Sequence, residues 1–383
     1  MIAPLSMHLP RRLSFGCGCT EKLAADLVQD GSRKVFFLTA RVTEPFAQEF
    51  ARELRAHGVA TEILGGIERE PTVDMFHATV ADVRRFNPDT VVGIGGGSVL
   101  DLAKLLAAFN GSSQTLDESL GINLLAPRST RIVCIPTTAG TGSEASPNAI
   151  LLDEKDALKK AVISPHLLPD ATYVDPKLMV GVPPKVTAAT GIDALTHCLE
   201  AFTNRFAHPM VDLYALEGVR LAAAFVTRAV LDGQDLEARE QMALASLYGG
   251  ICLGPVNTAA VHALAYPLGG EFHVPHGQSI ALMLPHVFRF NAVATPARHA
   301  HVALALGVQP QGDDLATAMA GAARLEELIA ACGLPPRLQD YAIELSSIPR
   351  LVESAMTVTR LLRNNPREVT ASDALDIYHR ACA

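Results

Sequence analysis

Residues 90–109 read TVVGIGGGSVLDLAKLLAAF and join a short apolar run, a glycine-rich turn and a helical pattern. The β-branched residues of TVVGI favour a strand, and LDLAKLLAAF has the spacing and composition of a helix. Glycines in such a turn let the backbone approach a phosphate, and the N–H groups at the helix start favour an anion. The stretch predicts an α/β unit with a pyrophosphate site at the turn from Gly93 to Ser98.

The glycine turn also has a purely structural interpretation, because glycines close tight turns without any ligand. Its spacing differs from GxGxxG, since Ser98 stands where the third glycine would be. A second turn of small and hydroxyl-bearing residues, PTTAGTGSE (136–144), follows another apolar run. Two such turns at the carboxyl ends of strands are what a nucleotide crevice requires, which favours the binding interpretation.

The chain on either side of this stretch alternates strand-like and helix-like patterns. VFFLT (35–39) and VATEIL (59–64) are apolar runs, and helical patterns follow each of them. Alternation of this kind predicts a parallel sheet flanked by helices. Further on, NAILLDEKDALKKAVIS has two apolar runs around residues 153–156, which predicts a β-hairpin beside the sheet, and ATYVDP (171–176) predicts a last strand.

From about Val182 the pattern changes, and Pro183-Pro184 marks the junction. Strand-like runs almost vanish, and the long amphipathic patterns that follow are rich in Ala and Leu, as helices favour. We therefore expect a dinucleotide-binding α/β domain over residues 1–181 and a helical metal-binding and substrate domain over residues 182–383. The helical patterns cover 187–203, 209–230, 235–252, 256–268, 278–291, 295–306, 314–332, 348–363 and 371–382.

Composition limits the class of protein. The 383 residues are 49% hydrophobic and carry a net charge of −8, which argues against a nucleic-acid or anionic-membrane partner. Seven scattered cysteines without a CxxC pair are typical of a reducing cytoplasm. No apolar run reaches the ~18 residues of a membrane span. We expect a cytoplasmic protein that binds neither membranes nor nucleic acids.

Two segments of the second half carry candidate metal ligands. In ATGIDALTHCLEAF (189–202), Asp193 and His197 are four residues apart and so share one helical face. VHALAYPLGGEFHVPHG (261–277) places His262 and His276 on either side of a Gly-Gly pair, where we expect a break. One aspartate and three histidines suit a divalent transition metal. With thirteen histidines in the chain, structural roles for these residues stay open on the pattern alone.

Four long motifs resemble those of the iron-containing (group III) alcohol dehydrogenase family. They are GIGGGSVLDLAK, PTTAGTGSE, TAATGIDALTHCLEAF and HALAYPLGGEFHVPHGQSIALMLPH, in the family's order and separations, and NPREVTASDALDIYHRA extends the resemblance almost to the C-terminus. The resemblance implies a dinucleotide-binding α/β domain, an all-helical domain and an active site in the interdomain cleft. It implies an NAD- or NADP-linked dehydrogenase or reductase of small alcohols and aldehydes, assembled as a homodimer or larger homo-oligomer.

The resemblance also assigns residues. It implies Fe(II), with Zn(II) as the alternative, because three imidazoles and one carboxylate suit either metal. The implied metal ligands are Asp193, His197, His262 and His276. The implied cofactor contacts are Gly95, Gly96, Gly97, Ser98, Thr137, Thr138, Thr141, Ser143, Asn148 and Lys159, with Lys160 as an off-by-one alternative to Lys159.

Two positions depart from the family pattern. Many members have a histidine four residues after the third ligand, proposed to relay a proton, and this chain has Tyr266 there. A phenol is a weaker base than imidazole at neutral pH, so His273 is a second relay candidate, or else a pocket wall. Many members also end the second cofactor strand with an aspartate, where this chain has Thr39-Ala40-Arg41. A 2′-phosphate is then not repelled, and Arg41 could contact it, which leaves NADP open.

Other functions share this architecture. Hydroxyacid-oxoacid transhydrogenases, maleylacetate reductases, glycerol dehydrogenase and dehydroquinate synthases are related in fold. The complete Asp-His-His-His set argues against the metal-free reductases, and dehydroquinate synthases carry different ligand motifs. A non-catalytic sensor is the alternative from another class, and the intact ligand set together with the intact glycine turn disfavours it.

Overall fold

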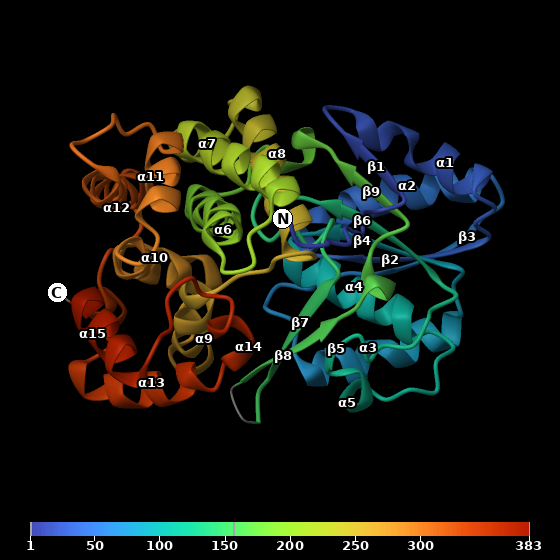
Figure 1. Ribbon diagram of the computed structural model, residues 1–383. Helices are drawn as coiled ribbons and strands as arrows, with labels where there is room; N and C mark the ends of the chain where they lie inside the picture. Colours follow the sequence, from blue (N-terminus) through green and yellow to red (C-terminus); the bar gives the residue numbers. More distant parts are fainter. Residues whose placement is uncertain (1, 156–157, 383) are drawn as a thin grey trace. The chain divides into compact units, whose positions relative to one another are not determined.

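Six parallel strands form the main sheet in the computed structural model, which describes residues 2–155 and 158–382 (Figure 1). The prediction of a parallel sheet is confirmed. The central strand β4 pairs with β2 on one side and β6 on the other, so that Val92 lies opposite both Phe37 and Val133. In spatial order the strands are β1 (Arg12–Phe15), β9 (Ala171–Val174), β6 (Arg131–Pro136), β4 (Thr90–Gly95), β2 (Lys34–Thr39) and β3 (Ala60–Leu64).

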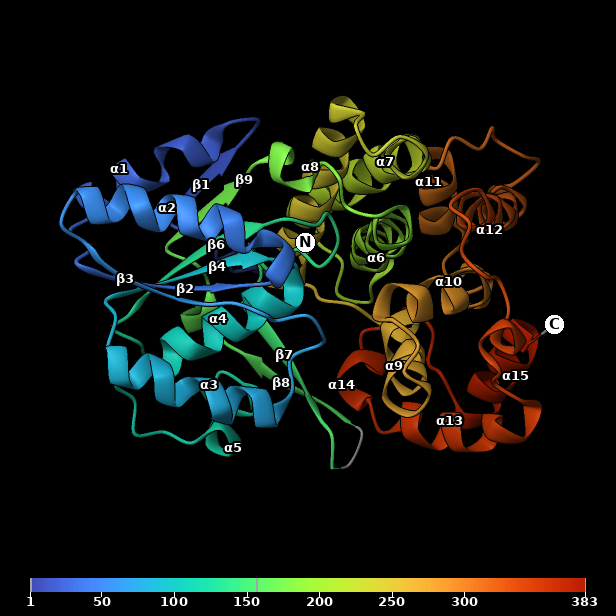
Figure 2. The same cartoon turned by 180° about the vertical axis from the view of Figure 1, so that it is seen from behind.

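Helices cover both faces of this sheet, as the views from opposite sides show (Figures 1 and 2). Successive residues of a strand point to opposite faces, so a continuous apolar run is buried on both. Phe36 and Leu38 of β2 pack into a cluster with α3 and α4, whereas Val35 and Phe37 pack with α1 and α2. The helices of this half are α1 (Leu23–Gln29), α2 (Glu44–Ala56), α3 (Val73–Phe86), α4 (Gly97–Phe109) and the short α5 (Leu116–Ser119).

A second, smaller sheet contains the expected hairpin. Strands β7 (Asn148–Asp153) and β8 (Leu158–Ile163) pair antiparallel, and β5 (Gly121–Ile122) joins β8. The hairpin prediction is confirmed, although Asp156 of its expected turn lies outside the described residues. Helix α4 contacts β4 and β6 of the main sheet and also β7. It is therefore covered on several sides, and most of its residues are buried.

The remaining part of the chain is helical, as expected, and no strand occurs in the described residues from 181 onwards. Together with residues 2–7 and 139–141 it forms one compact unit, and residues 8–138 and 142–180 form the other. None of the described helices has the length and hydropathy needed to span a bilayer. The helices are α6 (Pro184–Thr203), α7 (Pro209–Leu231), α8 (Leu236–Leu253), α9 (Ala260–Phe272), α10 (His276–Ala292), α11 (Pro296–Ala305), α12 (Asp314–Ala331), α13 (Ile348–Met356), α14 (Thr359–Leu362) and α15 (Ala371–Cys382).

Two expectations about helix boundaries were wrong. The pattern over 348–363 forms two helices, α13 and α14, separated at Thr357–Val358. The Gly-Gly pair at 269–270 does not interrupt α9, which continues to Phe272. Burial of the helix offsets the ~1 kcal/mol that a glycine costs in a helix interior. The helix ends instead at His273, whose φ is 54°, two residues before Pro275.

Helix α6 lies at the centre of the helical unit and contacts α7, α8 and α10. Two glycines on neighbouring helices permit close contact with it. A Cβ added to Gly249 of α8 would lie 3.0 Å from the His197 Cβ, and a Cβ added to Gly277 of α10 would lie 2.2 Å from the backbone oxygen of Ala189. A larger residue at 277 would therefore force α10 away from α6.

His299 of α11 is a buried histidine away from the candidate ligands. Its ring packs edge-on against Phe288, with the centroids 4.8 Å apart, and its Nδ1 donates to the Thr295 carbonyl at 2.9 Å. Its buried Nε2 has no hydrogen-bond partner among the described residues. Burial lowers the pKa of His299 to about 4.

We expect this histidine to weaken the protein in mild acid. His299 takes up a proton near pH ~6.5 in the unfolded chain but only near pH 4 in the folded chain. The free energy of unfolding therefore decreases as the pH falls between these values, by up to about 3 kcal/mol. Denaturant unfolding at pH 7.5 and 4.5 measures the loss, which should be smaller in His299→Gln than in wild type. The exposed His77→Gln is the control and should lose as much as wild type; an equal loss in all three proteins would contradict the prediction.

Candidate functional site

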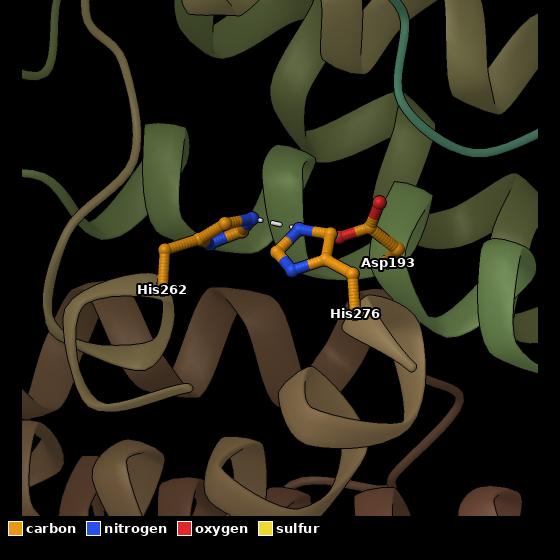
Figure 3. A group of neighbouring side chains, drawn as sticks. All are labelled: Asp193, His262 and His276. Atoms are coloured by element: carbon orange, nitrogen blue, oxygen red, sulfur yellow. Dashed lines mark ion pairs between the residues drawn. The ribbon is translucent and has the colours of Figure 1, made fainter. Parts of the chain in front are cut away.

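Three of the four candidate ligands lie together in the helical unit (Figure 3). Asp193 comes from α6, His262 from α9, and His276 is the first residue of α10. Their ligand atoms lie within 4.8 Å of one another. The Nε2 atoms of His262 and His276 lie 3.5 and 3.6 Å from the same oxygen, Oδ1 of Asp193.

His197, the fourth candidate, lies against the same carboxylate. Its Nε2 is 3.7 Å from Oδ1 of Asp193, one helical turn away as the spacing predicted, although it is not part of the mutually close group of three. Its ring stacks on that of His262, with the centroids 4.8 Å apart. Three imidazole Nε2 atoms therefore surround one carboxylate oxygen.

The chemistry of this cluster fits a divalent transition metal. Oδ1 of Asp193 and Nε2 of His262 are buried and have no hydrogen-bond partner within the described part of the chain, which is costly unless something else binds them. The 3.5–3.7 Å separations are long for hydrogen bonds. Tetrahedral ligands at about 2.0–2.1 Å from a metal lie about 3.4 Å apart, close to what is observed.

The protonation states of Asp193 and His197 suit metal binding, whereas His262 has to release a proton: burial lowers its pKa, but Glu200 and Asp193 outweigh burial and raise the pKa to about 9. Burial raises the pKa of Asp193, but His197 and His276 lower it more, so that the carboxylate is ionised. Burial lowers the pKa of His197 below its usual value, against the opposing effect of Asp193, so that this ring is neutral at neutral pH. An ionised carboxylate and a neutral imidazole are the forms that coordinate a metal.

Glu200, which was not predicted from the sequence, holds a candidate metal ligand in place. One of its carboxylate oxygens accepts from Nδ1 of His262 at 2.6 Å, and the other accepts from the backbone N–H of Val261 at 2.7 Å. A proton held on Nδ1 leaves the Nε2 lone pair directed at Asp193, as in carboxylate–histidine–metal arrangements. The available signal was spacing, because Glu200 follows Asp193 by seven residues and so shares its helical face.

A backbone carbonyl orients His197 in the same way. Its Nδ1 donates to the oxygen of Gly140 at 3.2 Å, which leaves Nε2 directed at Asp193. Gly140 comes from the PTTAGTGSE turn and packs against α6, since a Cβ added to it would lie 2.7 Å from the Cβ of Thr190. The second predicted cofactor turn therefore also supports a candidate metal ligand.

The two candidate proton relays occupy different surroundings. Tyr266 lies one turn after His262 on α9, and its half-buried ring has its centroid 6.1 Å from that of His276. His273 ends α9 in a left-handed conformation, and its side chain is exposed. Tyr266 is thus the relay candidate that lies next to a candidate metal ligand.

In the α/β unit, Thr137 and Thr138 of the second predicted cofactor turn lie beside the glycine turn. Strand β4 ends at Gly95, and Gly96 precedes α4, which begins at Gly97 and Ser98. The N–H of Thr137 donates to the Gly95 carbonyl at 3.0 Å. A Cβ added to Gly96 would lie 3.2 Å from the Thr138 hydroxyl. Adjacent turns at the carboxyl ends of parallel strands are where nucleotides bind in open α/β sheets.

The other predicted cofactor residues differ in their contacts. The Ser143 hydroxyl hydrogen-bonds to the Asp101 carboxylate of α4, and Thr141 is half-buried in the short 139–141 segment. The register pairs Asn148 with Ile163. Because residues alternate between the two faces, Lys159 shares the face of Asn148, and Lys160 lies on the opposite face. This arrangement favours Lys159 over Lys160 as the partner of Asn148.

Asn148 and Lys159 are both largely enclosed. The Asn148 Oδ1 is buried and has no hydrogen-bond partner among residues 2–155 and 158–382. Nζ of Lys159 lies 2.5 Å from a carboxylate oxygen of Glu70. Glu70 was not predicted from the sequence, and it gives the lysine a fixed ionic contact.

Arg41, the candidate contact for a 2′-phosphate, is exposed and paired with Glu68 at 2.9 Å. The Thr39 hydroxyl is buried and hydrogen-bonds to Thr43 at 2.7 Å and to the Ile94 carbonyl at 3.0 Å. A carboxylate therefore does stand near the end of β2, and it comes from the segment after β3.

Family models match almost the whole chain. The model described as "Iron-containing alcohol dehydrogenase" matches residues 10–176, and the one described as "Fe-containing alcohol dehydrogenase family, C-terminal" matches residues 187–382. The two matches are contiguous apart from a ten-residue gap and together include every candidate site residue.

Individual relatives agree with these matches. The chain is 35% identical to long-chain-alcohol dehydrogenase 1 of Geobacillus thermodenitrificans (strain NG80-2), over 96% of this chain and 94% of that protein. It is 31% identical to the NAD-dependent methanol dehydrogenase of Bacillus methanolicus, over 98% and 99%. A crystal structure of 1,3-propanediol oxidoreductase superposes with a TM-score of 0.94 at 31% identity, over 99% of this chain and 100% of that one. The chain belongs to the iron-containing alcohol dehydrogenase family.

Proposed function

We propose that this protein is a metal-dependent, NAD(P)-linked alcohol dehydrogenase that also catalyses the reverse reduction of aldehydes. The observation that carries the proposal is the placement of three imidazole Nε2 atoms around one buried carboxylate oxygen that has no hydrogen-bond partner among the described residues. Membership of the family makes it an oxidoreductase acting on CH–OH groups. Its relatives include enzymes named for methanol and for long-chain alcohols, so family membership leaves the length of the substrate open.

Different groups have different roles in this reaction. When bound, the cation supplies a Lewis acid for the substrate oxygen, and the nicotinamide carries the hydride. We assign the cation to Asp193, His197, His262 and His276. Glu200 and the Gly140 carbonyl hold the Nδ1 protons of His262 and His197, which keeps each Nε2 available. Asp193, His197 and His262 are buried, which keeps water away from that side of the site.

For the cofactor, we assign the α/β domain over residues 1–181, with the metal and the substrate assigned to residues 182–383. We propose NAD as the preferred cofactor, because Glu68 pairs with Arg41 and its charge opposes a 2′-phosphate there. We propose Fe(II) as the resident metal on the strength of the family models, with Zn(II) able to use the same ligands.

Location and assembly are further proposals. None of the described cysteines forms a disulfide, which fits a reducing cytoplasm. We propose a homodimer or a larger homo-oligomer, and sedimentation of the purified protein tests it; a monomer at assay concentrations would overturn that proposal.

An activity panel tests the main proposal. The metal-free protein is reconstituted separately with Fe(II) and Zn(II) and assayed with alcohols and aldehydes of increasing length, using NAD(H) and NADP(H). We expect metal-stimulated turnover with a larger kcat/KM for NADH than for NADPH. Absence of metal-stimulated turnover on every substrate would overturn the proposal, and cofactor retained through desalting would point to a transhydrogenase.

Tyr266→Phe is expected to lower kcat by about 10²–10⁴-fold and to change the pH–rate profile, if the Tyr266 hydroxyl passes the substrate proton. The position supports this role, because Tyr266 lies beside His276. Tyr214→Phe, a half-buried tyrosine that packs on Tyr248 of α8, is the matched control and should leave the profile unchanged. An unchanged profile in Tyr266→Phe together with an altered one in His273→Ala would assign the relay to His273.

A further inference from the structure

Lys104 of α4 is a completely buried lysine, with 0% of its surface exposed. Its Nζ donates to the carbonyl of Ser143 at 2.9 Å, to that of Ser146 at 3.3 Å, and to that of Asn148. The Asp101 carboxylate lies 3.4 Å from the same ammonium. A buried charge is tolerated only when it is paired and hydrogen-bonded, and here three carbonyls and one carboxylate satisfy it.

Asp101 holds the same segment by two further bonds. One carboxylate oxygen accepts from the Ser143 hydroxyl, and the other accepts from the backbone N–H of Ile150 at 3.0 Å. Asp101 and Lys104 are three residues apart and so share one face of α4. Together they fix the chain from Ser143 to Ile150 to that helix.

The start of the same loop is fixed to the other predicted cofactor turn. Thr137 donates to Gly95 at 3.0 Å, immediately before α4 begins. We name residues 137–148 the anchored loop, because both of its ends are bonded to the β4–α4 segment. Between the two anchors lies Gly140, whose carbonyl accepts from Nδ1 of His197. The anchored loop therefore contacts both the glycine turn and His197, so a change in its conformation affects both.

We propose that Lys104, assisted by Asp101, is a positioning residue that fixes the anchored loop and so couples cofactor binding to metal binding. The inference rests on the proposed function, according to which the protein binds both a dinucleotide and a metal. A cofactor that orders the anchored loop also holds the Gly140 carbonyl against His197, and a bound metal favours the same loop conformation. Linkage requires the effect to be reciprocal, so each ligand tightens the binding of the other.

Two binding measurements on the Zn(II)-loaded protein test this without relying on turnover. One is the NADH dissociation constant from the fluorescence of the bound dinucleotide, and the other is the equilibrium loss of Zn(II) to a competing chelator with and without saturating NADH. In wild type, NADH should lower the apparent Zn(II) dissociation constant by a factor of about 5–150, the usual range of coupling between sites. In Lys104→Met, NADH should bind about tenfold or more weakly, and its effect on Zn(II) loss should largely disappear.

Arg128→Met is a matched control from the same unit. Arg128 also donates to three carbonyls, those of Thr130, His166 and Leu168, and pairs with a carboxylate, Asp170, at 2.7 Å. It does so beside the start of β6, at the opposite end of that strand from the anchored loop. Arg128 is largely buried, with 12% of its side chain exposed. The general effect of removing an enclosed cation should therefore appear in both variants, whereas the coupling between NADH and Zn(II) should be lost in Lys104→Met alone.

A milder variant covers the case in which Lys104→Met does not fold. Asp101→Asn keeps the size of the side chain but removes its charge, and it should show the same loss of coupling in smaller measure. Equal effects of Lys104→Met and Arg128→Met, or Zn(II) loss from wild type that NADH does not change, would overturn the inference. Wild-type protein that binds neither Zn(II) nor NADH would overturn the proposed function itself.

Discussion

Asp193→Asn is expected to remove the metal and to lower kcat/KM by about a thousandfold or more, since the Lewis acid contributes several kcal/mol to the transition state. The carboxylate oxygen of Asp193 is the atom that all three histidines approach, at 3.5–3.7 Å. An amide in its place lacks the negative charge that offsets the cation. Elemental analysis of the purified variant, with kcat/KM measured on the same sample, checks both parts of the prediction.

The control for this variant is Asp212→Asn on α7. Asp212 is a partly buried carboxylate of the same unit that pairs with Arg298 at 2.6 Å and has no contact with the candidate ligands among the described residues. It should keep its metal and its activity. Full metal content and activity in Asp193→Asn would show that the cluster is not the metal centre, and circular dichroism separates loss of metal from loss of fold.

Glu200→Gln is expected to weaken metal binding by about 10- to 100-fold, as is usual when the carboxylate behind a ligating histidine is removed. Glu200 accepts from two donors on opposite oxygens, the Val261 N–H and Nδ1 of His262. Glutamine offers one acceptor oxygen, so in either orientation its amide group faces one of these donors. The His262 ring then loses its fixed tautomer or α9 loses its anchor to α6. Competition with a chelator of known affinity measures the change.

Thr196→Val on the same helix is the matched control. Thr196 is buried, and its hydroxyl donates to the Ile192 carbonyl within α6 at 2.7 Å. Its replacement also removes a buried polar group, at a position between Asp193 and His197 in the sequence, but no partner of His262 is lost. Equal weakening in both variants would mean that α6 is merely loosened and that Glu200 has no particular role in holding His262.

The sequence predicted the strands and helices well where apolar residues decide them. Runs such as VFFLT and TVVGI are buried on both faces of the sheet, and a strongly apolar run admits few alternatives. β1 was missed because RLSF is short and mixed, and only its pairing with β9 makes it a strand. The Gly-Gly pair of α9 was misread because local propensity disfavours helix there and tertiary burial outweighs it.

For the candidate site, too, local sequence predicted some features and tertiary packing decided the others. Asp193 and His197 could be paired from spacing alone, because one helix carries both. The approach of His262 and His276 depends on how α9 and α10 pack against α6, which no local pattern records. Lys104 gave no signal at all, since a lysine in a helical pattern is ordinarily exposed and its burial follows from the second sheet covering α4.

The backbone contact between α10 and α6 at Gly277 has a consequence for which metal is found in the protein. The candidate ligands are carried by helices, and two of these helices touch with no side chain between them, so the positions of the candidate ligands do not depend on a cation. Such a site offers every cation the same three nitrogens and one oxygen, a set that suits tetrahedral zinc and that zinc ordinarily binds more tightly than iron. We therefore expect that Fe(II), the proposed resident metal, is replaced by zinc when the growth medium supplies both in abundance.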